Sequence, residues 1–268
     1  MFALIIGIDR YQSFSIPALR GAVSDANAVQ DYLQKYLAVP SSQIRIIRDS
    51  EATRATILHA IDALTTDDRI QRGDPILIFY AGHGSTAPTP AGWKIGDPEI
   101  QLLVPHDHLC DNSKGGKVYG IPDGTLAMLL GRLVTAKGDN IVCRVSKLFF
   151  NHLTLFQTVI LDCCYSGSKT RVDKASSLLV RGIDTKEEIP ANLDQDIINS
   201  GVTGVAGGFA HSLKFHCLFL AACGVTESAQ ECGGRGFFTR ALLDVLVTCG
   251  TDNLTTKDLV RRIPILPG

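Results

Sequence analysis

The sequence lacks the features that mark membrane and nucleic-acid-binding proteins. Although 45% of its 268 residues are hydrophobic, no stretch reaches the roughly 18 apolar residues of a membrane span. Its 26 Lys and Arg residues are balanced by 27 Asp and Glu residues, and no long basic run occurs. A formal net charge of −1 creates no field that attracts polyanions. We therefore expect neither a nucleic acid nor a membrane as a partner.

Several chemical motifs are also missing. The eight cysteines include no Cys-x-x-Cys pair, which argues against a zinc ribbon. The adjacent Cys163 and Cys164 are poorly placed for a structural disulfide, so we expect reduced thiols and a cytoplasmic protein. No basic, cleavable leader precedes the first apolar run. There is also no Gly-x-Ser-x-Gly elbow, phosphate-binding glycine loop or dinucleotide fingerprint.

What the chain does contain is an alternation of apolar runs and amphipathic segments. Strands are expected at residues 2–9, 43–48, 75–80, 101–104, 159–161 and 216–221, and helices at 24–37, 53–64, 123–136 and 236–247. This order predicts an α/β fold, a three-layer α/β/α sandwich with a mainly parallel sheet. We expect residues 1–268 to form one catalytic domain. Residues 85–97 and 167–208 are expected to be loops.

Two phrases at strand ends carry the strongest chemical signal. Residues 79–84 read Phe-Tyr-Ala-Gly-His-Gly and deliver His83, while residues 159–167 read Val-Ile-Leu-Asp-Cys-Cys-Tyr-Ser-Gly. Ligands of open α/β sheets bind beyond the carboxyl ends of the strands, so a thiol and an imidazole are expected at one edge. That pair suits nucleophilic catalysis, with the histidine moving protons. Taken singly, the first phrase is explained equally well by a histidine in a turn, and the second by a buried thiol with no catalytic role.

Together the phrases resemble the histidine and cysteine signatures of metacaspases, which belong to the caspase-like cysteine peptidases. The resemblance extends to residues 3–11, 19–25, 220–223 and 234–239. It implies a caspase-like fold in which Cys164 is the nucleophile and His83 is the base. Cys163 is the alternative nucleophile. The main-chain N–H groups of Gly84 and Cys164 would form the oxyanion hole.

The resemblance also implies an endopeptidase that cleaves after Arg or Lys. Metacaspases recognise these residues with acidic side chains, and Asp25 and Asp162 stand at matching positions. Two carboxylates are a reasonable partner for a guanidinium group. The alternative roles are capping of a helix for Asp25 and anchoring of a loop for Asp162. The expected partners are protein and peptide substrates with Arg or Lys at the cleavage site, and the expected state is a monomer.

No cofactor is needed for this chemistry, but the resemblance implies calcium as an activator. The candidate ligands lack a calcium-loop spacing, so no metal site is assigned; they are Asp97, Glu99, Asp107 and Asp111. His106 and His108 have no third ligand beside them and are expected on the surface. The resemblance further implies self-cleavage within residues 167–208, which contain Lys169, Arg171, Lys174, Arg181 and Lys186. The alternative is an ordinary solvated linker.

The interval between His83 and Cys164 is longer than the resemblance leads us to expect. Residues 142–157 account for the excess, and without them residues 138–141 would join 158–161. This segment is either a surface insertion or a translated retained intron. The intron reading rests on its ends: it begins with Val, whose codons start with GT, and ends with Gln, which can be encoded by CAG, so the segment can start with GT and end with AG as introns do. An insertion beside the Cys164 strand would compromise catalysis if it shifted the thiol. The alternative function is therefore a catalytically inactive caspase-like interaction module. A different α/β hydrolase or transferase using Cys164 is a third reading.

Overall fold

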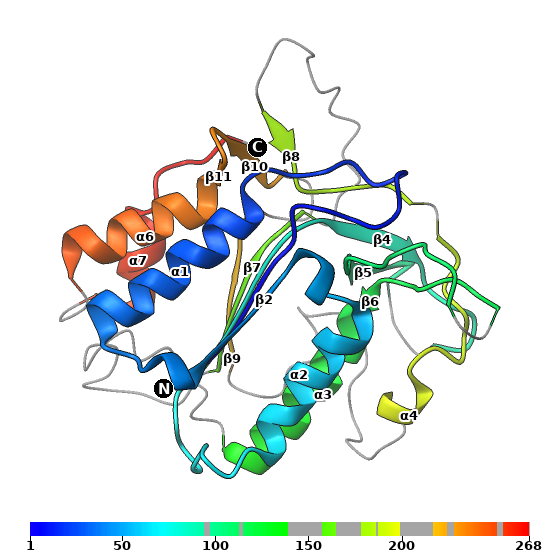
Figure 1. Ribbon diagram of the computed structural model, residues 1–268, viewed down its shortest axis with the longest axis horizontal. Coiled ribbons are helices and arrows are strands. Elements are labelled where there is room, and N and C mark those ends of the chain that lie inside the picture. The colour runs from blue at the N-terminus through cyan, green and yellow to red at the C-terminus, as the bar shows by residue number, and fades with distance from the viewer. Residues whose placement is uncertain are drawn as a thin grey trace.

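A five-stranded parallel sheet forms the centre of the molecule, in the order β2–β1–β3–β7–β9 (Figure 1). The computed structural model describes residues 1–93, 97–112, 115–138, 157–164, 178–185, 187–198, 217–223, 228–250 and 254–267. The strands of this sheet are β1 (Phe2–Gly7), β2 (Ile44–Arg48), β3 (Ile76–Ala81), β7 (Gln157–Asp162) and β9 (Cys217–Ala221).

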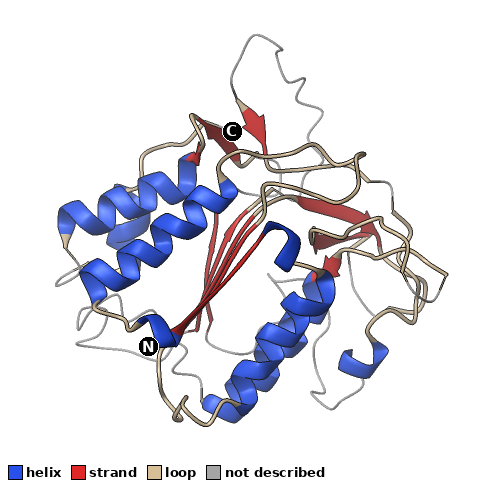
Figure 2. Ribbon diagram, in the orientation of Figure 1, coloured by secondary structure: helices blue, strands red, loops and turns tan. Residues whose placement is uncertain are grey.

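Helices cover both faces of this sheet (Figure 2). One layer contains α1 (Ala22–Leu37), α6 (Phe237–Cys249) and α7 (Thr256–Arg262), and the other contains α2 (Arg54–Thr66) and α3 (Asp123–Lys137). Leu4 and Ile6 of β1 belong to the core beneath α2 and α3, while Ala3 and Ile5 face the α1 and α6 side. Strands that are buried on both faces read as unbroken apolar runs. The three-layer α/β/α prediction is confirmed.

Local capping fixes where two of these helices begin. Thr53 precedes α2, and its side chain accepts a hydrogen bond from the N–H of Thr56. Thr255 and Asp258 form a capping box at the start of α7. Such caps satisfy N–H groups that the helix itself leaves unpaired. The buried face of α2 then carries Ile57, Ala60 and Ile61.

Two small antiparallel sheets lie beside the main one. One has the order β4–β5–β6, made of Gly84–Pro88, Glu99–Leu103 and Ile121–Pro122. The other has the order β11–β10–β8, made of Arg235–Gly236, Gln230–Cys232 and Leu179–Val180. The short elements η1 (Ser41–Gln43), η2 (Asp49–Glu51) and α4 (Gln195–Ile198) complete the described structure.

The loop prediction for residues 85–97 is wrong over its first part, because residues 85–88 belong to β4. Pro88 favours a loop when only the sequence is considered. It ends a strand at the edge of its sheet, where a missing N–H donor is tolerated. Most of residues 142–157 lie outside the described residues, but Gln157 pairs with Cys217 as the first residue of β7. No helix in the described part of the chain is long and apolar enough to cross a membrane.

Candidate active site

The two chemical phrases meet at the carboxyl edge of the main sheet. Ala81, the last residue of β3, pairs with Asp162, the last residue of β7. His83 and Cys164 each follow two residues later. The parallel pairing of neighbouring strands therefore brings an imidazole and a thiol to one edge, as expected from the sequence.

The His83 ring is held with one nitrogen turned to the main chain. Its Nε2 lies 2.8 Å from the carbonyl oxygen of Pro17. A carbonyl only accepts, so Nε2 carries the proton and Nδ1 keeps a lone pair. Nδ1 is buried and has no hydrogen-bond partner among the described residues. Burial lowers the pKa of His83 to about 4, so at neutral pH the ring is an uncharged proton acceptor.

The two adjacent cysteines have different surroundings, although both are fully buried. Cys163 belongs to the hydrophobic core beneath α2 and α3, and its carbonyl accepts a hydrogen bond from Cys223 Sγ at 3.6 Å. The Cys164 side chain is hydrogen-bonded to Cys223, and this contact, together with burial, raises the pKa of the Cys223 thiol. Cys223 therefore stays protonated, and its single S–H donates to the Cys163 carbonyl. The two cysteines thus differ in their surroundings, since Cys163 packs in this core and Cys164 lies against Cys223.

Two N–H groups converge on one carbonyl oxygen at this edge. The main-chain N–H groups of Gly84 and Cys164 both donate to the carbonyl of Arg181, each at 3.0 Å. Paired main-chain donors beside a nucleophile are the arrangement that stabilises an oxyanion during acyl transfer. The predicted oxyanion residues thus lie together, and a carbonyl of the chain itself lies against them.

Residues on both sides of Arg181 are bound as an added strand. On the N-terminal side, Leu179 and Val180 pair with β10, and the Arg181 N–H donates to Ala229 at 2.9 Å. On the C-terminal side, the Ile183 N–H donates to the carbonyl of Gly84 at 3.0 Å. Strand addition is a common way for proteins to bind an extended peptide. Residues 179–183 thus lie across the edge as a bound peptide would.

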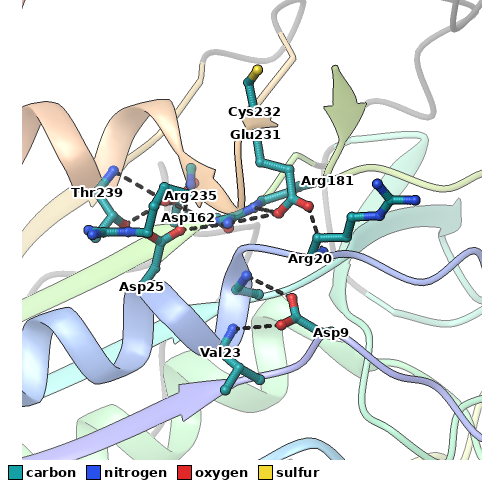
Figure 3. Close-up of polar contacts among 12 residues, drawn as sticks. Asp9, Arg20, Val23, Asp25, Asp162, Arg181, Glu231, Cys232, Arg235 and Thr239 are labelled. Atoms are coloured by element: carbon teal, nitrogen blue, oxygen red, sulfur yellow. Dashed lines mark hydrogen bonds and ion pairs between the residues drawn. The ribbon is translucent and has the colours of Figure 1, made fainter. Parts of the chain in front are cut away.

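The Arg181 side chain is fully buried among three carboxylates (Figure 3). Its Nη2 lies 2.6 Å from Asp25 Oδ2, and its Nη1 lies 2.9 Å from Asp162 Oδ2. The third carboxylate, Glu231, lies 3.0 Å from Nη2. Burial acts to lower the pKa of Arg181, but Asp162, Asp25 and Glu231 outweigh it, and the pKa is raised. The two predicted specificity carboxylates therefore share one arginine, with a third that sequence reasoning missed.

Neighbouring groups hold the two aspartates in place. Asp25 accepts from the Gly236 N–H at 2.8 Å and from Arg235 Nε at 2.5 Å, while Asp162 accepts from the hydroxyl of Thr239 at 2.5 Å. A Cβ at Gly236 would come within 2.7 Å of both aspartates, so a side chain there would have to displace the two carboxylates. Gly21 precedes α1, and the first N–H groups of the helix, those of Ala22 and Val23, donate to the Asp9 carboxylate. Asp25 therefore faces the arginine and does not cap the helix.

The fold agrees with a comparison against known families. A model described as the caspase domain of peptidase C14 matches residues 1–263. The chain belongs to the caspase-domain peptidase family.

The crystal structure of protein GSU0716 from Geobacter sulfurreducens is similar to this caspase domain. Its TM-score is 0.63 at 18% sequence identity, and the match covers 98% of this chain and 89% of that chain. At this identity the likeness concerns the fold alone. Comparison with curated proteins gives no match.

The acidic residues considered for calcium do not assemble a site in this caspase domain. Asp107 accepts from the N–H of Arg54 at 2.8 Å, and Asp111 lies 2.6 Å from Lys117 Nζ. Asp97 and Glu99 are exposed. The described residues contain no group of three or more His, Cys, Asp or Glu side chains that could hold a metal ion.

The prediction that His108 lies on the surface is wrong. His108 is fully buried, and its Nε2 lies 3.4 Å from the Glu187 carboxylate. Burial lowers the pKa of His108 from 6.5 to about 4 and raises that of Glu187 from 4.5 to about 7. The sequence places both in polar segments, and only tertiary packing brings them together. His106, by contrast, is partly buried, and its Nδ1 lies 2.7 Å from the carbonyl of Arg10.

This pair predicts a pH dependence of stability that single substitutions should reveal. The raised pKa of Glu187 gives stability that is lost as the pH rises toward 7, and the lowered pKa of His108 gives stability that is lost as the pH falls toward 4. In the wild type the two slopes oppose each other between pH 4.5 and 6.5. In His108→Gln, only Glu187 titrates. As the pH rises across that window, the free energy of unfolding should therefore fall relative to wild type by up to about 1.4 kcal/mol per pH unit. Urea titrations measure it.

The matched control is Glu187→Gln, which leaves His108 as the group that titrates. Its free energy of unfolding should rise with pH over the same window, with the opposite sign to His108→Gln. Parallel pH profiles for the two variants would contradict the opposing shifts.

Proposed function

We propose that this caspase domain is a cysteine endopeptidase that hydrolyses peptide bonds after Arg or Lys through a Cys164–His83 dyad. The observation that carries the proposal is the position of Arg181. Its carbonyl accepts from Gly84 and Cys164, while its guanidinium lies among the acidic side chains. A substrate residue taking this position would have its carbonyl carbon beside Cys164 and its basic side chain matched by opposite charge.

In the proposed reaction, the thiol of Cys164 gives its proton to His83, and its sulfur forms a bond to the carbonyl carbon. The carbonyl electron pair moves to oxygen, where the Gly84 and Cys164 N–H groups stabilise the charge. The tetrahedral species collapses, the C–N bond breaks, and His83 gives its proton to the leaving amine. Water then attacks the thioester with His83 as base, and the acid product and the free thiol are released.

The proposal is tested with fluorogenic peptides that carry the chain's own sequence 178–180, Leu-Leu-Val, followed by Arg, Lys or Asp. We expect hydrolysis after Arg and Lys, none after Asp, and none by Cys164→Ala. Cleavage after Asp alone would contradict the acidic pocket. Absence of all cleavage by folded protein, together with an intact Arg181–Gly182 bond, would favour the inactive interaction module. No step of the proposed chemistry uses a metal. Assays with and without millimolar calcium test whether calcium nevertheless activates the enzyme.

We also propose that the enzyme acts as a cytoplasmic monomer on protein and peptide substrates. The free cysteines among the described residues support a reducing compartment. Sedimentation of the purified protein at several concentrations tests the monomer: a mass that doubles as the concentration rises would contradict it.

A further inference from the structure

The third carboxylate, Glu231, is rigidly positioned on β10. It is 1% exposed, and its Oε1 accepts a hydrogen bond from the main-chain N–H of Arg20 at 2.7 Å. A Cβ at residue 21 would lie 2.9 Å from Oε2, so the chain passes this close because Gly21 has no side chain. The main chain therefore holds Oε1 independently of Arg181, and Oε2 is left to contact the guanidinium group.

Glu231 contacts a different part of the guanidinium group from the two aspartates. Asp25 pairs with the terminal nitrogen Nη2, and Asp162 pairs with the terminal nitrogen Nη1. Glu231 Oε2 accepts from Nε at 3.1 Å and from Nη2 at 3.0 Å, along one side of the planar fork. Each of the three guanidinium nitrogens thus has a carboxylate partner.

A lysine side chain cannot reproduce this set of contacts. Its single ammonium nitrogen cannot stand beside Glu231, Asp25 and Asp162 at the three positions that Nε, Nη1 and Nη2 occupy. At least one buried carboxylate would lose its direct partner, and an unpaired buried charge is strongly unfavourable. The N–H on Nε, which meets Glu231, is a group that only arginine supplies.

We infer that Glu231 makes the enzyme select arginine over lysine in the residue before the cleaved bond. The inference rests on the proposed function and narrows its substrate class to arginyl bonds. Glu231 also pairs through its main chain with Leu179. The strand that aligns the substrate chain therefore also carries the carboxylate that recognises its side chain.

The test compares kcat/KM for two peptides that differ only in the last residue, Leu-Leu-Val-Arg and Leu-Leu-Val-Lys. We expect the wild type to prefer the Arg peptide by about 10- to 100-fold, the scale of a hydrogen bond to a charged group. Glu231→Gln should lose most of its activity on the Arg peptide and little on the Lys peptide, so that the ratio approaches one. The control Asp162→Asn should lower both activities and retain most of the ratio.

A substrate-side change makes the same test without altering the protein. An Arg peptide methylated on Nε keeps the Nη2 donor but loses the Nε–H that only Glu231 accepts, and we expect its kcat/KM to fall at least about 10-fold. Equal use of the Arg and Lys peptides, an unchanged ratio in Glu231→Gln, or full activity on the methylated peptide would each overturn the inference. None of these results would affect the proposed peptidase.

Binding separates this inference from the failure of catalysis. In a Cys164→Ala, Arg181→Ala protein, fluorescence anisotropy reports affinity for the labelled peptides without cleavage. Tighter binding of the Arg peptide by about 10-fold or more, lost on adding Glu231→Gln, supports the selection even if no hydrolysis occurs. Equal affinities would overturn it.

Discussion

Purified wild-type protein is expected to be cut between Arg181 and Gly182, whereas Cys164→Ala stays intact. The Arg181 carbonyl accepts from both Gly84 and Cys164 at 3.0 Å, so this bond is already in the position that the proposed reaction requires. Holding reactants in such a geometry accounts for a large share of enzymatic rate enhancement. Intact mass spectrometry should show two fragments, the second starting at Gly182.

Two controls test which bond is cut and whether the cleavage is intramolecular. Arg181→Ala should remain whole at this bond, because its side chain no longer meets the carboxylates. Cys164→Ala mixed with active enzyme should also remain whole there, because its own Arg181 is 0% exposed. Cleavage of that variant by added enzyme, or cutting of the wild type only at another basic residue, would contradict the prediction.

The two fragments should stay associated after cleavage. The C-terminal fragment supplies β9, which pairs with β7 along the central sheet, and Phe238 and Leu242 of α6, which belong to the core beside α1. Apolar burial on this scale holds elements together without a covalent link. Size-exclusion chromatography of the cut protein should give one peak containing both fragments, and separate elution would contradict this.

The sequence predicts the middle of the main sheet well because β1 and β3 are buried on both faces. Residues 76–81 of β3 are uniformly apolar, and a run of this kind followed by Gly82 and His83 gives both the strand and the place where it ends. Small edge strands carry no such signal. The pair Leu179–Val180 forms β8 only because β10 lies beside it, and two residues are too few for a period to be read.

The candidate site was predictable where it follows the main strands and not where distant loops supply it. His83 and Cys164 stand at strand ends, so the topology brings them together. Arg181 lies within residues 167–208, expected to be a loop, and Glu231 lies in a polar stretch. Charged residues in such places usually face water, and these two meet only in the folded chain. The one local hint is the apolar run 178–180 directly before Arg181, which indicates a short paired segment within the long loop.

The intact chain should be a poor enzyme toward added peptides, because Arg181 already occupies the site. Two variants that both resist self-cleavage separate occupancy from processing. Gly182→Pro keeps Arg181 in place but puts a crowded ring nitrogen in the scissile bond, whereas Arg181→Ala empties the acidic pocket. We expect kcat/KM on Leu-Leu-Val-Arg amide to be higher in Arg181→Ala by about 100-fold, because a tethered segment competes at an effective concentration near millimolar.

The proline variant is well matched, since it removes no hydrogen bond described at this position. The contacts around residue 182 use the N–H groups of Gly84 and Ile183, and Gly182 is not among the glycines with positive φ. Circular dichroism checks that both variants fold. Equal activities would mean that residues 179–183 leave the site readily.

The kcat/KM of cut wild-type protein on this peptide should lie between those of Gly182→Pro and Arg181→Ala. Cleavage leaves Arg181 as a new C-terminus, which keeps its contacts with Asp25 and Glu231 but loses the tether through Gly182 to Ile183. Its effective concentration at the site then drops, and an added arginyl peptide can displace it. If activity appears at the same rate as the fragments, activation consists of the release of this segment and not of the assembly of the Cys164–His83 pair.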